Sequence, residues 1–366
     1  MDSDKIAIFI PTLEGGGTEA TMLGLAGGLV ERGYDVDLLL KQKQGKLGDA
    51  IPAGIRVVDF NVPAMRHTFP KLIAYLDHAK PKAVVSALEL PNITTILARR
   101  FAVHKPRLII SIRGLLSKQR PIYSRRVDRM LERMFYPRAD DIVCVSRACA
   151  ADAIRHARLP ESKVSVIYNP IIDVDIYRKM NEPLSQPWLQ DPHKTTIVAV
   201  GRLEPVKDHQ TLLKAFKRVR EERDAQLVIL GEGSLQGALT AQAAELGIEK
   251  DLILPGFVAN PFNILARANL SVLSSLREAL PGVLIQAMAC QCPVVSTACG
   301  GAEEVLADGK YGHLVPVGDD AAMAVAMRKV LDGDRRLAPE AWLAQFHKDR
   351  VIAQYQDLIE RLPERR

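Results

Sequence analysis

Residues 5–40 read KIAIFIPTLEGGGTEATMLGLAGGLVERGYDVDLLL, and this stretch decides the fold. It begins with an apolar run of β type, Lys5 to Ile10, which a glycine-rich turn follows at once. Thr18 to Arg32 then has apolar residues at helical spacing, Gly33 ends that helix, and Asp35 to Leu40 is a second apolar run. A strand, a glycine loop, a helix and a strand in this order predict a parallel sheet with a right-handed crossover.

The same alternation of strand and helix patterns runs through the rest of the chain, with one interruption. Residues 181–193 carry three prolines among polar residues, which is typical of a linker between domains. Further strands are predicted at Ile55–Phe60, Ala83–Ser86, Leu108–Ile112, Asp141–Val145, Lys163–Ile167, Thr195–Val200, Ala225–Leu230, Leu252–Leu254, Leu270–Val272 and Pro293–Ser296. Helical patterns include His209–Arg223, Gln236–Leu246, Val283–Ala289 and Ala341–Leu362. The predicted fold is α/β, with two Rossmann-like, doubly wound domains.

The composition is that of a folded globular protein, with 366 residues of which 48% are hydrophobic and 25% charged. The five cysteines are an odd, low number for a long chain, so we expect reduced thiols and a cytoplasmic location. No targeting segment is recognisable, because the first apolar run leads directly into Pro11 and the glycine turn. No run of about 18 apolar residues exists, so we expect no membrane-spanning helix. Aromatic residues make up only 5% of the chain, and we expect no nucleic-acid partner.

The positive charge of the chain is concentrated in one segment. The net charge is +6, and residues 113–138 contain eight lysines and arginines against two acidic residues. Within Pro121 to Met134, apolar residues recur at helical spacing between arginines. Such a helix either lies on an anionic membrane surface or packs its apolar side on the sheet. The candidates for membrane contact are Lys118, Arg120, Arg125, Arg126, Arg129 and Arg133.

The glycine turn after the first strand is a candidate phosphate site. Residues 14–19 read EGGGTE, and glycines such as Gly16 and Gly17 let the backbone approach a ligand closely. The helix that follows offers free N–H groups at its start. The spacing matches neither the dinucleotide fingerprint nor the P-loop, so a plain tight turn is the alternative interpretation.

Two cations at the end of a later strand form a second candidate site. Arg202 and Lys207 lie in the loop that follows Thr195–Val200. A guanidinium supplies forked donors and an ammonium a compact charge, a combination that suits a diphosphate. Where a diphosphate is the leaving group, fixed cations stabilise its developing charge. Two solvated surface charges are the alternative.

A third candidate is the segment EALPGVLIQAMA at residues 278–289. Glu278 precedes a loop that contains proline and glycine, and Gln286 falls in the helix after that loop. Loop amides can bind an anion or a sugar hydroxyl, and both side chains can bond hydroxyl groups. A buried strand and the turn at Gly300-Gly301 follow. An ordinary helix start does not account for the whole array.

Together these segments resemble the retaining, GT-B fold glycosyltransferases of the large family 4, over nearly the whole chain. The resemblance also includes Val145-Ser146, Tyr168–Asp173, Gly231–Gly233 and Pro255–Val258. It implies two Rossmann-like domains that face each other across a cleft. We expect the acceptor-side domain at residues 1–180, the nucleotide-sugar domain at 194–344, and a C-terminal helix at 345–366 that crosses back to the first domain.

The resemblance implies a role for each candidate residue. Arg202, Lys207 and Glu278 form the catalytic set, with the cations on the donor diphosphate and the carboxylate on the donor sugar. The implied donor is a UDP-sugar, or a GDP-sugar as second choice, and the transferred group is a hexose or an N-acetylhexosamine. The implied acceptor is a glycan or a lipid-diphosphate-linked glycan of a cell-surface polysaccharide or glycoconjugate. The donor-binding residues are Gly16, Gly17, Gly256, Phe257, Val258, Leu280, Pro281, Gly282, Val283 and Gln286.

Two positions depart from the family pattern. Gln286 stands where the family has a second glutamate that binds the ribose, so the charge-assisted part of that interaction is lost. Arg113 stands where many members have a histidine near the donor sugar. We place Arg113 and Glu89 on the acceptor side.

No metal or cofactor is expected. The two D-x-D matches, Asp35–Asp37 and Asp173–Asp175, are interpreted as structural, because the Arg202/Lys207 pair makes a bridging cation unnecessary. Two rival functions remain at this point. One is a nucleotide-sugar-binding protein with weakened catalysis, which Gln286 indicates. The other is an epimerase or phosphorylase of the same fold.

Overall fold

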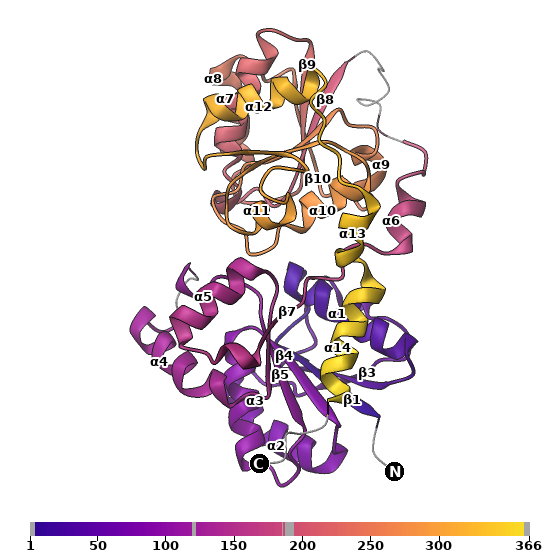
Figure 1. The fold of residues 1–366 in the computed structure, drawn as a ribbon, viewed down its shortest axis with the longest axis vertical. Helices are drawn as coiled ribbons and strands as arrows, with labels where there is room; N and C mark the ends of the chain where they lie inside the picture. The colour runs from indigo at the N-terminus through magenta and orange to yellow at the C-terminus, as the bar shows by residue number, and fades with distance from the viewer. Residues whose placement is uncertain (1–3, 119–121, 185, 187–193, 362–366) are drawn as a thin grey trace. The chain divides into compact units, whose positions relative to one another are not determined.

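The computed structural model describes residues 4–118, 122–184, 186 and 194–361, and the chain forms two compact units (Figure 1). The first unit combines residues 1–170 with residues 348–366, and the second consists of residues 171–347. Helix α6 (Val174–Lys179) belongs to the second unit, although the sequence pattern placed residues up to 180 in the first domain. The reason is that α6 packs against α9 (Phe262–Leu265) and α10 (Gly282–Ala289).

The first unit is built on a seven-stranded parallel sheet in the order β3-β2-β1-β4-β5-β6-β7. Its strands are β1 (Lys5–Ile10), β2 (Asp35–Leu40), β3 (Arg56–Asp59), β4 (Ala83–Ala87), β5 (Arg107–Ile112), β6 (Asp141–Cys144) and β7 (Val164–Val166). Its helices are α1 (Gly17–Glu31), α2 (Thr68–Ala79), α3 (Glu89–Phe101), α4 (Arg125–Phe135), α5 (Arg147–Ala157) and α14 (Lys348–Glu360). The register sets Ile8 between Leu38 and Val85, and all three are fully buried.

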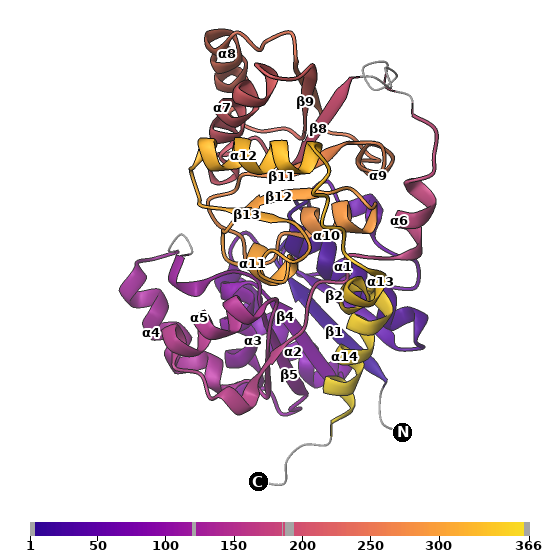
Figure 2. The ribbon, with the colours of Figure 1, turned by 45° about the horizontal axis from the view of Figure 1, so that its top comes forward.

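The last helix of the chain, α14, completes the core of the first unit. Helix α14 lies beside α1 (Figure 2). Val351, Ile352 and Tyr355 are buried in the same apolar cluster as Met22 of α1. A Cβ atom at Gly28 of α1 would lie 2.6 Å from the Ile352 Cγ1. The glycine therefore permits the close approach of the two helices.

The second unit is built on a six-stranded parallel sheet in the order β10-β9-β8-β11-β12-β13. Its strands are β8 (Thr195–Val200), β9 (Ala225–Leu230), β10 (Leu252–Gly256), β11 (Leu270–Leu273), β12 (Val294–Thr297) and β13 (His313–Val315). Its further helices are α7 (His209–Arg220), α8 (Gln236–Leu246), α11 (Gly301–Val305), α12 (Asp320–Leu331) and α13 (Glu340–Leu343). Helices α7, α8 and α12 share one apolar cluster with the sheet.

Most elements lie where the sequence patterns placed them, with strand ends that differ by one or two residues. The tail is an exception, because one helix was predicted over Ala341–Leu362. The structure instead has α13 and α14, and His347 between them has extended backbone (φ −69°, ψ 138°). A β-bridge between Ile172 and His347 accounts for this break.

Candidate active site

The candidate donor site of the second unit lies where two central strands end. The strand order reverses between β8 and β11, and ligands of doubly wound sheets bind outside the carboxyl ends of such strands. Arg202 and Lys207 follow β8, and Glu278 follows β11. The topology therefore brings all three candidate catalytic residues to one edge of the sheet.

Lys207 and Glu278 form a partly buried ion pair. The Lys207 Nζ lies 2.6 Å from the Glu278 Oε1, and each side chain is 18% exposed. The Ser275 hydroxyl donates to the same carboxylate oxygen at 2.9 Å. The Ser274 hydroxyl donates to the Lys207 carbonyl at 2.7 Å. Lys207 is thus held in place and is not a freely solvated charge.

Two glycines allow the loop that carries Arg202 to pack against its neighbour. A Cβ atom at Gly231 would lie 2.1 Å from the Gly201 carbonyl oxygen, and one at Gly233 would lie 2.4 Å from the Leu203 carbonyl oxygen. Both contacts involve backbone that cannot move aside, so only glycine fits. Arg202 itself is exposed at the tip of this packed loop.

The loop after Glu278 packs tightly against the turn at Gly300-Gly301. The Glu278 amide donates to the Cys299 carbonyl at 2.8 Å, and the Gly301 amide donates to the Glu278 carbonyl at 2.9 Å. A Cβ atom at Gly301 would lie 2.2 Å from the Ala279 carbonyl oxygen. Because these contacts fix the backbone of Glu278, they also determine where its carboxylate can reach.

Helix α10 begins directly after this loop with free backbone donors. Pro281 precedes the helix and has no polar side chain to cap it, so the N–H groups at Gly282 and Val283 are available to an anion or a hydroxyl. Leu280 and Pro281 are buried and support the turn. Gln286 lies half-buried one turn into α10.

The expected base-binding segment follows β10. Gly256 ends the strand with a positive φ of 81°, which turns the chain sharply. Phe257 is 74% exposed, and Val258 is half-buried. An exposed ring of this kind offers an aromatic face for stacking, which stays a prediction for this chain.

In the first unit, the glycine turn after β1 leads into the start of α1. Gly16 and Gly17 are exposed, and Gly17 is the first residue of the helix. A Cβ atom at Gly16 would meet only the flexible carboxylate of Glu19, at 2.4 Å. Close packing therefore does not require glycine at either position, which leaves ligand approach as a reason for both.

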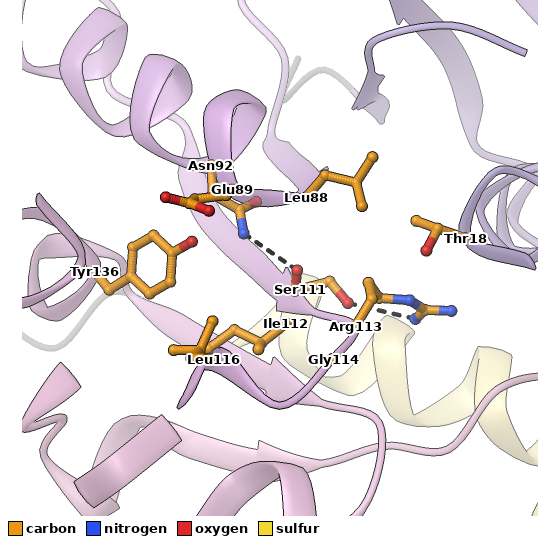
Figure 3. Close-up of a pocket in the computed structure, with 10 residues that line it drawn as sticks. All are labelled: Thr18, Leu88, Glu89, Asn92, Ser111, Ile112, Arg113, Gly114, Leu116 and Tyr136. Carbon is orange, nitrogen blue, oxygen red and sulfur yellow. Dashed lines mark hydrogen bonds between the residues drawn. The ribbon is translucent and has the colours of Figure 1, made fainter. Parts of the chain in front are cut away.

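A pocket lined by both polar and apolar side chains opens at the carboxyl ends of β4 and β5 (Figure 3). Its volume is about 150 Å³. Asn92 is fixed on its wall, because its amide donates to the Ser111 carbonyl at 3.2 Å and accepts from the Ser86 hydroxyl at 2.8 Å. The Arg113 guanidinium lies 3.4 Å from the Ser111 hydroxyl. The residues that line the pocket are Thr18, Leu88, Glu89, Asn92, Ser111, Ile112, Arg113, Gly114, Leu116 and Tyr136.

Both acceptor-side candidates therefore line one pocket, and burial changes the proton affinity of each. Burial lowers the pKa of Arg113, although its guanidinium keeps its charge at neutral pH. Burial and, secondarily, the negative charge of Asp128 raise the pKa of Glu89 to about 7. Glu132 has its pKa raised to about 8, chiefly by burial and then by Glu89.

Helix α4 buries two carboxylates against the protein and leaves apolar side chains exposed. Asp128 and Glu132, four residues apart, are 6% and 3% exposed, whereas Met130 is 56% exposed. The carboxylate of Asp128 accepts from the amides of Ile122 and Tyr123 at 2.9 and 3.2 Å. Packing of the apolar side on the sheet, the alternative drawn from the sequence, is therefore wrong for the exposed residues Val127, Met130 and Met134.

The basic candidates surround this exposed apolar side. Lys118, Arg125, Arg126 and Arg129 are exposed, and the Arg133 Nε donates to the His156 carbonyl at 2.9 Å. Arg120 lies outside the described residues. No helix within the described parts of the chain has both the length and the apolarity to cross a membrane.

The D-x-D aspartates contact protein groups. Asp37 is buried against Arg56 and accepts from the Tyr75 hydroxyl at 2.6 Å. Asp173 caps α6 by accepting from the Ile176 amide at 3.2 Å. These contacts give both motifs structural roles.

Several residues of the pocket were missed from the sequence. Leu88 and Asn92 lie at the start of α3, but Tyr136 comes from the turn after α4, so no local motif joins all three. Asp128 and Glu132 did carry a signal, because two carboxylates one helical turn apart in a basic helix share a face.

Two doubly wound parallel units, one with a cation–carboxylate pair at its switch point, are the architecture of GT-B fold glycosyltransferases. The model of the family described as Glycosyltransferase Family 4 matches residues 15–173. The model described as Glycosyl transferases group 1 matches residues 194–333. The chain belongs to this family of glycosyltransferases.

A relative of similar sequence agrees with this assignment, and solved structures share the fold. The chain is 29% identical over 344 residues to the N-acetylgalactosamine-N,N'-diacetylbacillosaminyl-diphospho-undecaprenol 4-alpha-N-acetylgalactosaminyltransferase of Campylobacter jejuni, covering 90% of this chain and 91% of that protein. A glycosyltransferase from Rickettsia africae has a TM-score of 0.83 at 16% identity, covering 98% of both chains. Anabaena HepE in complex with UDP has a TM-score of 0.81 at 20% identity, covering 98% of this chain and 100% of that one. The two structures support the fold.

Proposed function

We propose that this protein transfers an N-acetylhexosamine or a hexose from a UDP-sugar to a lipid-diphosphate-linked glycan, with retention at the anomeric carbon. The observation that carries the proposal is the fixed Lys207–Glu278 pair beside the free start of α10. The Campylobacter jejuni relative, whose name specifies N-acetylgalactosamine transfer to a diphospho-undecaprenol acceptor, supports the choice of sugar and acceptor.

In the proposed reaction, the second unit stabilises the leaving diphosphate. Arg202 offers a forked set of donors and Lys207 a compact charge, so together they offset the negative charge that develops as the sugar–phosphate bond breaks. Glu278 and the N–H groups at the start of α10 hold sugar hydroxyls and orient the anomeric carbon. These groups act without a metal ion in the proposal.

A donor panel tests the proposal most directly. UDP-GalNAc, UDP-GlcNAc, UDP-glucose and a GDP-hexose are each incubated with excess chelator and an undecaprenyl diphosphate that carries an N-acetylgalactosamine-terminated disaccharide. We expect transfer from a UDP-sugar, with an α-anomeric product in the NMR spectrum. Binding of a nucleotide sugar without transfer to any acceptor would support the weakened binding protein instead, and a requirement for added metal would refute the metal-free mechanism.

A matched pair of lysine variants tests the role of the ion pair. Lys207→Ala removes a fixed cation from the leaving group, and the loss of one such group lowers kcat by about 10²- to 10³-fold. Lys214→Ala on α7 is the control, because Lys214 is exposed and away from the pair. Equal activity of the two variants would contradict the proposed role of Lys207.

We also propose that the protein acts at the surface of an anionic membrane, where a lipid-linked acceptor resides. The support is the exposed apolar side of α4, with arginines beside it. Each lysine or arginine near an anionic surface contributes about 1 kcal/mol.

A further inference from the structure

The second unit contains a histidine whose ring is buried without hydrogen bonds. His209 is the first residue of α7 and is 4% exposed. Among the described residues, neither its Nδ1 nor its Nε2 has a hydrogen-bond partner. A neutral imidazole has one N–H donor and one acceptor nitrogen, and buried polar atoms in folded proteins are nearly always paired. The unpaired ring therefore points to a second state of the site in which it finds a partner.

The imidazole lies beside the loop that carries the two candidate phosphate cations. The Arg202 backbone is near the ring without completing a hydrogen bond, and Lys207 and Asp208 are charged neighbours of the ring. The Lys207 end of the loop is fixed by Glu278 and Ser274. The Arg202 side chain, at the other end, is exposed. His209 is thus placed to act on the backbone of the exposed cation.

The ring of His209 is uncharged at neutral pH. Burial lowers the pKa of His209 to about 4, and the positive charge of Lys207 acts in the same direction. The Arg202 backbone acts in the opposite direction, as a carbonyl acceptor near a ring N–H does. His209 is therefore not a third cation for a phosphate. What it offers the loop is a neutral N–H donor near a carbonyl group.

Packing alone does not require a histidine at this position. Leu212 and Leu213 lie three and four residues further along α7, on the same side of the helix, and both are fully buried and apolar. A leucine at position 209 would extend this apolar side. It would also avoid burying unpaired polar atoms, which destabilise the folded state. Ligand binding accounts for the histidine better than folding does.

We propose that His209 is a positioning residue for the donor diphosphate. When the diphosphate binds Arg202 and Lys207, the loop shifts toward the ring, and the imidazole N–H donates to the Arg202 carbonyl. This carbonyl already accepts from the Glu204 amide at 2.9 Å, and its second lone pair is suited to the imidazole. The new hydrogen bond fixes the backbone of Arg202 and thereby the reach of its guanidinium.

The proposed hydrogen bond links ligand binding to the conformation of the loop. Because the bond forms only in the bound state, its free energy adds to the affinity for the diphosphate and not to the stability of the free protein. Every group involved belongs to the second unit. The inference rests on the proposed transferase function, since it concerns the loop to which the donor diphosphate is assigned.

His209→Leu separates this role from a structural one. The leucine removes the unpaired polar atoms, so the midpoint of thermal unfolding without ligand should stay the same or rise. The Kd for UDP, from isothermal titration calorimetry at neutral pH, should rise about 3- to 10-fold, the effect of one net hydrogen bond. A purely structural histidine would give the opposite pattern, with a lower midpoint and an unchanged Kd.

His313→Leu is the matched control. His313 is also buried in the second unit, at 6% exposure, but it lies on the edge strand β13. Its Nε2 already has a partner, the Asp334 carbonyl oxygen at 3.1 Å. Leucine breaks this existing interaction, so the unfolding midpoint of His313→Leu should fall while its Kd for UDP stays unchanged.

The ring resonances report the new hydrogen bond directly. Protein labelled with ¹⁵N in its histidine rings is titrated with UDP, and the His209 signals are assigned from their loss in His209→Leu. At saturation we expect the His209 ring N–H to move downfield, as hydrogen-bonded N–H groups do. The ring of His313 should not respond.

Two results would overturn the inference while leaving the proposed function in place. One is a folded His209→Leu protein that binds UDP as tightly as wild type. The other is a His209 ring N–H that does not shift at saturating UDP. Should wild type bind GDP and not UDP, both measurements use GDP. Wild-type protein that binds neither nucleotide would overturn the proposed function itself, and the inference with it.

Discussion

The Gln286 side chain lies half-buried one turn into α10, close in sequence to the free N–H groups at Gly282 and Val283. The family pattern has a glutamate there, whose carboxylate accepts charge-assisted bonds from ribose hydroxyls. Such bonds contribute about 1.5–3 kcal/mol, against about 0.5–1.5 kcal/mol for neutral ones. We therefore expect the Gln286 amide to bind the ribose more weakly than a carboxylate would.

Gln286→Glu is accordingly expected to lower the KM for the donor about fivefold, which corresponds to roughly 1 kcal/mol, with kcat unchanged. The check is steady-state kinetics with varied UDP-sugar. Gln236→Glu at the exposed start of α8 is the control for added negative charge. A severe loss of turnover in Gln286→Glu would mean that this position does not contact the ribose.

At the scale of elements, α4 has three distinct sides. Its carboxylates face inward, its apolar residues Val127, Met130 and Met134 are exposed, and its arginines lie between these two sides. Met130→Gln with Val127→Gln should weaken binding to vesicles of phosphatidylglycerol while leaving transfer to a water-soluble acceptor unchanged. Vesicle co-sedimentation at 0.05 and 0.5 M salt measures this. Equal sedimentation of variant and wild type would exclude α4 as the membrane contact.

We expect the same helix to make the stability of the first unit depend on pH, because burial raises the pKa of Glu132. The pKa of Glu132 in the folded state is raised to about 8. The stabilisation that protonated Glu132 gives the folded unit is therefore fully present below the unfolded pKa near 4.5, and it is lost as pH rises through 8. We expect the free energy of opening of the β5 amides, from hydrogen exchange, to fall between pH 5 and 9. The fall should be smaller in Glu132→Gln, whose amide does not titrate. Identical pH dependence in both proteins would refute this origin.

For the whole molecule, the sequence was enough to place every strand of the two sheets except β13, because each of the others is an apolar run bounded by glycine, proline or polar turns. It also gave Lys207 and Glu278 as candidate catalytic residues, but it did not predict their ion pair, which Ser275 and the backbone at Cys299 help to position. The three-residue strand β13 is too short to leave a pattern. The side that α4 turns inward was not predictable from apolar spacing, because buried carboxylates there take the place of apolar residues.

The core of the first unit is complete only when α14 packs on α1. Substitutions at the Gly28–Ile352 contact test this packing. Replacing glycine by alanine within a helix ordinarily stabilises the folded protein by about 1 kcal/mol. We expect this for Gly24→Ala, because the new Cβ would lie 3.9 Å from Pro170, an ordinary van der Waals distance. At Gly28 the Cβ would lie 2.6 Å from Ile352, so Gly28→Ala should instead destabilise the first unit by about 1–3 kcal/mol. In an Ile352→Ala background the clash is gone, and the same substitution should become stabilising. Urea unfolding of the wild type and the four variants measures these changes, and a stabilising Gly28→Ala in the wild-type background would show that α14 does not pack on α1 in solution.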